Sequence, residues 1–160
     1  MALIDETPID PGNEWVADHV RRYVESGGKE GGEFAPGVPV LLLTTRGRRS
    51  GWARRTPLVF GRDGDEYIVV ASFNGAPKDP DWFVNLAADP QVVLQVGADV
   101  MPGTARVASG AERDRLWALM TSISPGYEEA AAKAGREIPI VAVSPGQALG
   151  LGALGVPAPE

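Results

Sequence analysis

The chain has 160 residues, of which 44% are hydrophobic and 22% are charged. This length suits one domain with a single core. The absence of cysteine and the presence of one histidine exclude disulfides, a thiol nucleophile and a multi-histidine metal site within one chain. No apolar run approaches the roughly 20 residues that span a bilayer, and the first residues do not resemble a signal peptide. We therefore expect a cytoplasmic protein with no metal and no integral membrane segment, and leave peripheral attachment to a membrane open.

The charge is acidic overall but unevenly distributed. The formal net charge is −6 at pH 7, yet residues 46–55 contain five arginines. A nucleic-acid-binding protein usually has a broad basic surface, so no nucleic-acid partner is expected. A small, localised anion fits this distribution better, and the alternative is a solvated arginine-rich hairpin.

The first half of the chain predicts a helix and then strands. Residues 1–12 are polar and contain prolines, so we expect a flexible N-terminus. Asn13 can cap a helix that runs to about Ser26 and carries apolar residues and His19 on one face, which indicates a core or interface histidine. Strands are predicted at 38–45, 54–60 and 66–72, with an Asp63-Gly64 turn before the last and apolar residues on both of its faces.

The second half alternates helices with a strand pair and a final strand. Asp79 is the expected cap of a helix with Pro80 in its first position, and Ser109 with Glu112 predicts a capping box for the next. A further helix follows Pro125 and ends at Gly135. Strands are expected at 91–96, 103–108 and 138–143, and the tail at 144–160 is expected to be flexible or loosely docked.

This order predicts a mainly β (α+β) protein. Hairpins with short links and no βαβ alternation favour an antiparallel Greek-key barrel of about six strands with peripheral helices. We expect residues 13–143 to form this single domain.

Two loops have features of an anion site. In RGRRSG (46–51), glycines allow the backbone to turn, arginines offer planar donor pairs and serine offers a hydroxyl. In GAPK (75–78), Lys78 precedes a helix N-terminus, which also attracts anions. We expect the two loops to meet over one ligand, and the alternative is that Lys78 lies on a surface turn.

Several separated segments together resemble the deazaflavin-dependent nitroreductase family. They are LLLTTRGRRSG (41–51), GAPKDPDW (75–82), NLAADPQVVLQVG (85–97) and PGY…REIPIVAV (125–143). Members of this family use coenzyme F420 and have a split β-barrel fold. The resemblance therefore implies a split barrel, F420 as cofactor, and an oxidoreductase that transfers a hydride from reduced deazaflavin to a small apolar acceptor such as a quinone, enone or nitroaromatic.

The resemblance also implies roles for individual residues. Ser72 and Tyr127 are the implied catalytic hydrogen-bond donors. The implied substrate pocket contains Val59, Phe73, Trp82 and Ala130. The implied cofactor-binding residues are Arg48, Arg49, Ser50, Gly51, Arg54, Thr56, Pro57, Ala76, Pro77 and Lys78.

The chain departs from the family pattern on the substrate side. Phe73 and Asn74 stand where many members have lysine and glycine, Val59 replaces an aromatic residue, and Ala130 replaces a second tyrosine. Two alternatives stay open: a reductase that uses flavin mononucleotide (FMN) on the same fold, with FMN the less favoured cofactor, and a non-catalytic carrier of deazaflavin or fatty acid. The expected assembly is a monomer or a homodimer.

Overall fold

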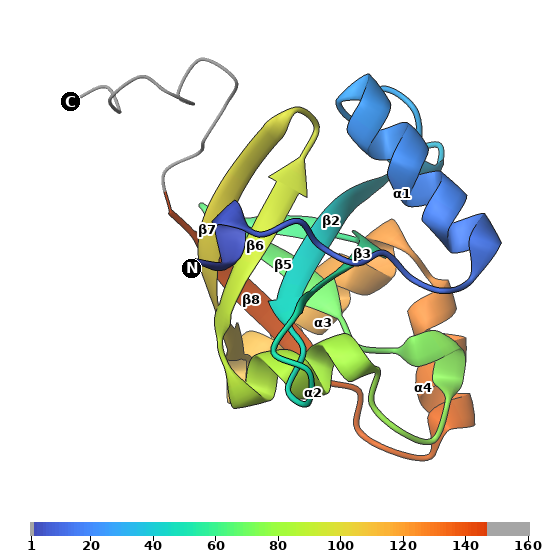
Figure 1. Cartoon of the computed structure of the whole chain (residues 1–160). Helices are drawn as coiled ribbons and strands as arrows, with labels where there is room; N and C mark the ends of the chain where they lie inside the picture. The colour runs from blue at the N-terminus through green and yellow to red at the C-terminus, as the bar shows by residue number, and fades with distance from the viewer. Residues whose placement is uncertain (1, 147–160) are drawn as a thin grey trace.

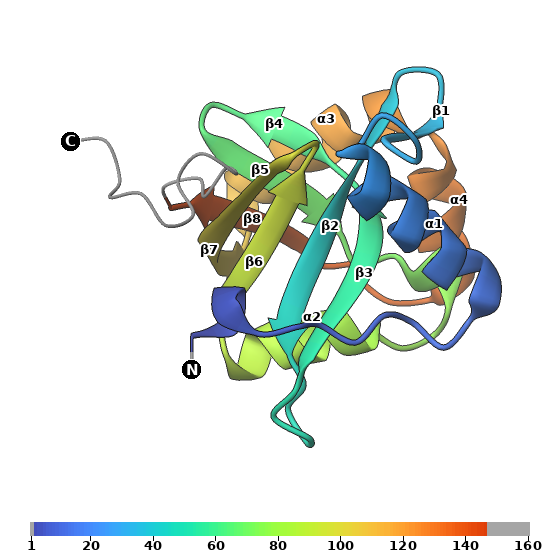
Figure 2. The same ribbon diagram turned by 45° about the horizontal axis from the view of Figure 1, so that its top comes forward.

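The structure, a computed structural model, describes residues 2–146. They form an antiparallel sheet in the order β1-β2-β6-β7-β8-β5-β4, with β3 paired to β2. The sheet curls into a half-barrel with helices around it (Figure 1, Figure 2). The strands are β1 (Glu33–Ala35), β2 (Val38–Arg46), β3 (Ala53–Val59), β4 (Gly61–Asp63), β5 (Glu66–Val70), β6 (Gln91–Val96), β7 (Asp99–Val107) and β8 (Ile140–Pro145).

The core lies on both sides of β5, as its two apolar faces predicted. Tyr67 and Val69 pack into the interior of the curled sheet with residues of β2, β6, β7 and β8. Ile68 and Val70 face the opposite way and pack against α3 and α4. A strand covered on both sides has no face left for polar residues, which explains why every residue from 67 to 70 is apolar.

The helices surround the barrel (Figure 1). Asn13 caps α1 by accepting a hydrogen bond from the Val16 amide at 3.2 Å, and Gly27 ends the helix with a φ of 64°. This confirms the predicted first helix and follows from the usual preference for a side-chain acceptor at the start and glycine at the end. The helices are η1 (Leu3–Asp5), α1 (Glu14–Ser26), η2 (Phe73–Gly75), α2 (Asp81–Ala88), α3 (Gly110–Ile123) and α4 (Gly126–Ala134).

The N-terminal segment 3–12, here called the N-terminal arm, lies against the barrel. Leu3 packs with residues of β3 and β6. The Ile9 amide donates to the Ala53 carbonyl, and the Ile9 carbonyl accepts from the Arg55 amide, both at 2.9 Å. The arm therefore satisfies backbone groups along the outer edge of β3, and Figure 2 shows it crossing the barrel to reach α1.

Two predicted capping interactions do not form, and in each an arginine binds the carboxylate instead. The α2 helix begins at Asp81 after Pro80, while the carboxylate of Asp79 accepts a hydrogen bond from Arg136 at 2.6 Å. Ser109 makes no capping hydrogen bond, and Glu112 instead accepts from Arg106 at 2.6 Å. The sequence also missed the three-residue strands β1 and β4, and residues 147–160 of the expected tail lie outside the described residues.

Candidate functional site

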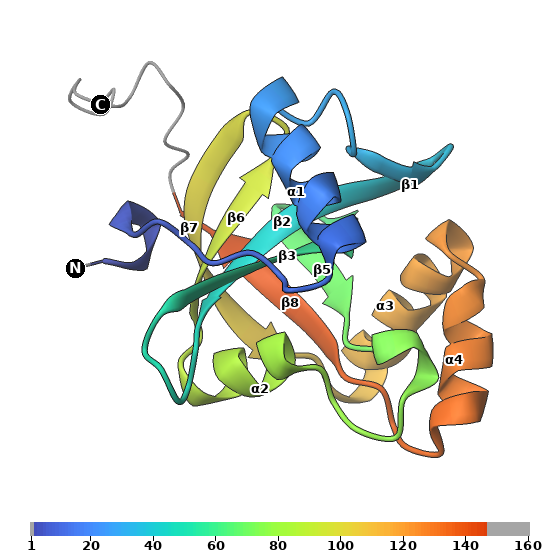
Figure 3. The same ribbon diagram turned by 45° about the vertical axis from the view of Figure 1, so that its right-hand side comes forward.

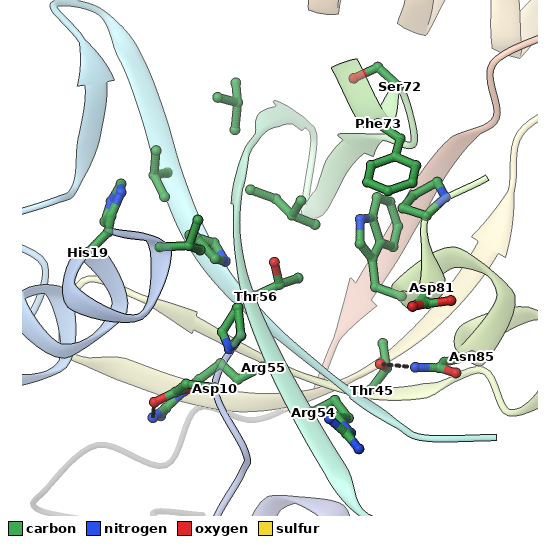
Figure 4. A pocket seen from close by; sticks show the side chains of 18 of the residues that line it. Asp10, His19, Thr45, Arg54, Arg55, Thr56, Ser72, Phe73, Asp81 and Asn85 are labelled. Carbon is green, nitrogen blue, oxygen red and sulfur yellow. Dashed lines mark hydrogen bonds and ion pairs between the residues drawn. The ribbon is translucent and has the colours of Figure 1, made fainter. Parts of the chain in front are cut away.

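A cavity of about 830 Å³ opens between β3, the N-terminal arm, α1, η2 and the start of α2. Figure 4 shows Ser72 and Phe73 along one side, with Asp81 and Asn85 below them, and His19 on the opposite side. Small-molecule sites in proteins commonly enclose roughly 300–1,000 Å³, so this space can hold a ligand of cofactor size.

The loop between β2 and β3, together with the start of β3, forms a cationic end of this cavity. Arg48, Arg49, Ser50 and Arg54 all line it. The loop closes tightly, because the Gly47 amide donates to the Trp52 carbonyl at 2.7 Å. A Cβ at Gly47 would lie 2.7 Å from the Ser50 Oγ, so a larger residue there would displace the serine. Glycine at position 47 thus leaves room for the Ser50 hydroxyl beside the arginines.

Asn85, on α2, orients Arg48. The Asn85 Oδ1 accepts from Arg48 Nη1 at 2.8 Å and from the Arg48 amide at 3.2 Å. Its Nδ2 donates in turn to the Thr45 Oγ1 at 3.3 Å, as Figure 4 shows. The Asn85 side chain is buried, whereas Arg48 also reaches the exposed carboxylate of Asp81 at 3.3 Å. A buried amide with all three contacts fixes the direction of the guanidinium.

Two of the five clustered arginines are already paired with the N-terminal arm. Arg46 donates to Glu6 at 2.6 Å, and this hydrogen bond holds the pKa of the Glu6 carboxyl below its usual value. Arg55 binds the two oxygens of Asp10 at 2.7 and 3.1 Å. Neither of them is among the predicted cofactor-binding arginines, Arg48, Arg49 and Arg54, which line the cavity.

The other walls of the cavity are mainly apolar, with several hydroxyl groups among them. Pro57, Val59 and Trp82 line it together with the polar Thr56, and Ser72 and Tyr127 face the same space. Tyr127 comes from α4, with its ring centroid 6.5 Å from that of Trp117. Burial raises the pKa of Tyr127 to about 12, so its hydroxyl stays protonated at neutral pH and can donate a hydrogen bond.

Five predicted site residues do not line the cavity: Gly51, Ala76, Pro77, Lys78 and Ala130. Lys78 lies on the surface, and its carbonyl accepts from Arg136 at 2.9 Å. Ala130, on α4, is partly buried and packs against the core cluster that includes Leu116 and Met120. The loop before α2 does meet the arginine loop, but Pro80 and Asp81 make the approach and Lys78 does not.

The sequence reasoning missed several residues that line the cavity. His19, expected in the core or an interface, borders the cavity, and its Nε2 lies 2.8 Å from the Gly31 carbonyl oxygen. Trp15 and Phe34, both exposed, also line it. The spacing of Trp15, Val16 and His19 on one face of α1 was the available signal, but it could not distinguish a face that meets a core from one that meets a cavity.

Solved structures match this fold. A structure titled as an F420-H2 dependent reductase is 40% identical, with a TM-score of 0.62 over 66% of this chain and 93% of that one. A structure titled as a domain-swapped dimer is 35% identical, with a TM-score of 0.64 over 83% of this chain and 99% of the other. A Listeria innocua protein titled as a pyridoxamine 5'-phosphate oxidase candidate shares the fold alone, at 15% identity and a TM-score of 0.50 over 70% and 87% of the two chains. Fold and cavity together define a split-barrel protein with a ligand site that is cationic at one end.

The family is narrower than the fold. A family model described as F420H2-dependent quinone reductase matches residues 15–145, and the chain belongs to this family. A Mycobacterium tuberculosis H37Rv protein described as an F420H2-dependent quinone reductase is 33% identical over 79% of this chain and 87% of its own length. Another protein of that strain, described as a candidate for the same activity, is 36% identical over 72% and 97%. The resemblance and the split-barrel fold predicted from the sequence are thus confirmed.

Proposed function

We propose that this protein is an oxidoreductase that transfers a hydride from reduced coenzyme F420 to a quinone. The observation that carries the proposal is a single cavity in which three arginines adjoin a mainly apolar wall. A flat, polyanionic cofactor and an apolar acceptor need such a combination, and the family assignment points to the same pair.

The cationic end fits the acidic part of F420. Arg48, Arg49 and Arg54 would bind its phosphate and carboxylates, and the Ser50 hydroxyl would add a donor. Charge-assisted hydrogen bonds from several guanidinium groups to one anion are stronger than neutral ones, and Asn85 holds Arg48 in place for this contact. Gly51, with a φ of 77°, would serve only to turn the loop. Thr56 and Pro57, next along β3, would lie beside the deazaflavin ring.

Reduced F420, when bound, supplies the hydride. The protein has to orient the acceptor, exclude water and stabilise the negative charge that develops on a quinone oxygen. Among the hydroxyl groups that line the cavity, we assign Tyr127 and Ser72 as the donors to this oxygen, and the raised pKa of Tyr127 keeps its proton in place for donation. Donors fixed before the reaction lower the barrier because they need not reorganise as charge appears.

The acceptor side is apolar. Val59, Phe73 and Trp82 line the cavity beyond the arginines, and none of them offers an anionic or cationic group. A flat, uncharged quinone ring matches these walls, so we place the acceptor among them. Nitroaromatics and enones have similar flat cores and are the comparison substrates in the test below.

We also propose a homodimer located in the cytoplasm. A solved relative is titled as a domain-swapped dimer, which supports a homodimer here. None of the helices within residues 2–146 is long and apolar enough to cross a bilayer. Light scattering after size exclusion tests the assembly, and cell fractionation tests the location; a monomer or a membrane-bound fraction would contradict the respective statement.

Titration and turnover test the proposed activity. Purified protein is titrated with F420 and with FMN by fluorescence, and reduced F420 is then mixed with a quinone, an enone and a nitroaromatic. We expect tighter binding of F420 than of FMN, and quinone-dependent reoxidation of reduced F420. Tight F420 binding with no acceptor turned over would instead indicate a carrier, and preferential FMN binding would overturn the cofactor assignment.

A further inference from the structure

The loop between β5 and α2 holds an unfavourable backbone conformation at the edge of the cavity. Phe73, Asn74 and Gly75 follow one another with φ angles of 46°, 54° and 79°. Within residues 2–146, Phe73 and Asn74 are the non-glycine residues with positive φ. In this region the Cβ of an L-residue crowds its own backbone, and a bulky residue such as phenylalanine is disfavoured there. Surrounding contacts must therefore hold the loop in place.

Arg136, which follows α4, makes these contacts. Its Nε donates to the Ala76 carbonyl at 3.0 Å, and its Nη2 donates to the Lys78 carbonyl at 2.9 Å. Its Nη1 binds the Asp79 carboxylate at 2.6 Å, and longer contacts of 3.3 and 3.4 Å reach the carbonyls of residues 71 and 72. The side chain is only 16% exposed. One guanidinium thus binds both ends of the strained turn.

The loop also lies tightly against α4, as Figure 3 shows for η2. Gly75 is buried, and a Cβ there would lie 3.0 Å from Lys133 Cδ and 3.1 Å from the Ala130 carbonyl oxygen. The loop therefore cannot move closer to the helix. Arg136 binds the loop by hydrogen bonds from just beyond the end of that helix. The turn is therefore held both by packing against α4 and by the Arg136 guanidinium.

We propose that Arg136 is a positioning residue: it holds residues 71–79 in the strained conformation and so fixes Ser72 and Phe73 at the acceptor side of the cavity. Arg136 does not itself line the cavity, whereas Ser72 and Phe73 do. Phe73 is 45% exposed, so packing alone does not hold its ring. The proposal rests on the proposed function, because it assigns these two side chains to the acceptor.

The test is a double-mutant cycle between Arg136 and Asn74. Arg136→Met removes every donor and keeps the alkyl stem, and Asn74→Gly lets residue 74 adopt positive φ without strain. Displacement of a reacting group by about 1 Å can cost on the order of 100-fold in rate. We expect Arg136→Met to lower kcat/KM for the quinone about tenfold or more, with F420 affinity within about threefold of wild type. In the Asn74→Gly background, Arg136→Met should lower kcat/KM by a several-fold smaller factor. The kcat/KM of Arg136→Lys should lie between those of the wild type and Arg136→Met.

Arg113→Met is the matched control. The Arg113 side chain is 18% exposed and donates to the Ile138 carbonyl at 2.6 Å, and within residues 2–146 no hydrogen bond or ion pair joins it to residues 71–79. A merely stabilising arginine would behave like Arg113, with a lower Tm and no coupling to residue 74. Equal losses from Arg136→Met in both backgrounds, or a loss confined to F420 affinity, would overturn the proposal.

Hydrogen exchange separates this proposal from the proposed function. In protein without cofactor, Arg136→Met should speed amide exchange in residues 71–79 and leave β2 protected, with a smaller effect in the Asn74→Gly background. If the wild-type protein failed to reduce quinones, the proposed activity would fall while the exchange result would still decide whether Arg136 holds the loop. Uniform acceleration across the barrel would reject the positioning role.

Discussion

Replacing Tyr127 by phenylalanine separates a hydrogen-bond donor from a packing residue. The substitution removes one oxygen and leaves the ring beside Trp117. The described residues provide no hydrogen-bond partner for this hydroxyl, so we expect the free energy of unfolding to change by no more than about 0.5 kcal/mol. Removal of one donor to a developing oxyanion costs about 100- to 1,000-fold in kcat, or about 2.7–4 kcal/mol in barrier height. We therefore expect a large kinetic loss with a nearly unchanged Tm.

The pH dependence provides an independent check. The Tyr127 hydroxyl donates only while protonated, and its pKa of about 12 keeps it so across the neutral range. The wild-type kcat should therefore show no inflection from Tyr127 until the pH approaches 12. Because the folded-state pKa lies above the usual value of 10, the stability linked to this group is present below pH 10 and is lost as the pH rises from 10 to 12. Tyr127→Phe should lack this loss.

Steady-state kinetics with reduced F420 and a quinone, together with urea unfolding, measure both quantities. Tyr127→Trp tests whether a bulkier ring alone disturbs the cavity wall. An unchanged kcat in Tyr127→Phe would refute the donor role and leave the ring as a packing element. A loss of unfolding free energy as large as the rise in the activation free energy would refute the separation between donation and packing.

Three further predictions concern the cationic loop and the barrel. Arg48→Ala combined with Arg49→Ala should weaken F420 binding at least tenfold at low salt and flatten its salt dependence, whereas Arg46→Ala, whose partner is Glu6, should leave the affinity unchanged in the same fluorescence titration. Asn85→Leu should weaken F420 binding about tenfold, because removal of a hydrogen bond to a charged group costs about 1.5–3 kcal/mol; an unchanged Kd would show that Arg48 needs no orienting partner. Gly103→Ala should destabilise the barrel by about 1–3 kcal/mol in urea unfolding, since the new Cβ would lie 2.7 Å from Val143 Cγ1, and an unchanged midpoint would mean that β8 can shift to make room.

Local patterns predicted the regular elements well. The two-sided apolar run of β5, the Asn13 cap and the Asp63-Gly64 turn depend on neighbours in sequence, and each is present in the structure. The Asp79 cap failed because a competing donor, Arg136, comes from 57 residues away. Side-chain capping is predictable only when no distant group binds the same carboxylate more strongly.

The candidate site was less predictable because its contacts also depend on residues that are distant in sequence. The glycine and arginine spacing of residues 46–55 indicated an anion site, and the loop does border the cavity. Sequence could not show that Arg46 and Arg55 are paired with Glu6 and Asp10, 40 and 45 residues away. Nor could it show that the Lys78 side chain lies outside the cavity, because the direction of a side chain on a turn is set by the contacts of the whole loop.

The N-terminal arm has a practical consequence for anyone who shortens this protein. The match to the family begins at residue 15, whereas Ile9, Asp10 and Pro11 form part of the cavity wall. A variant trimmed to the family boundaries would keep every strand of the barrel and yet present a wider opening, with the Arg55 guanidinium freed from its carboxylate. Ligand affinities measured on such a trimmed variant would describe a cavity with a wider and more positively charged opening.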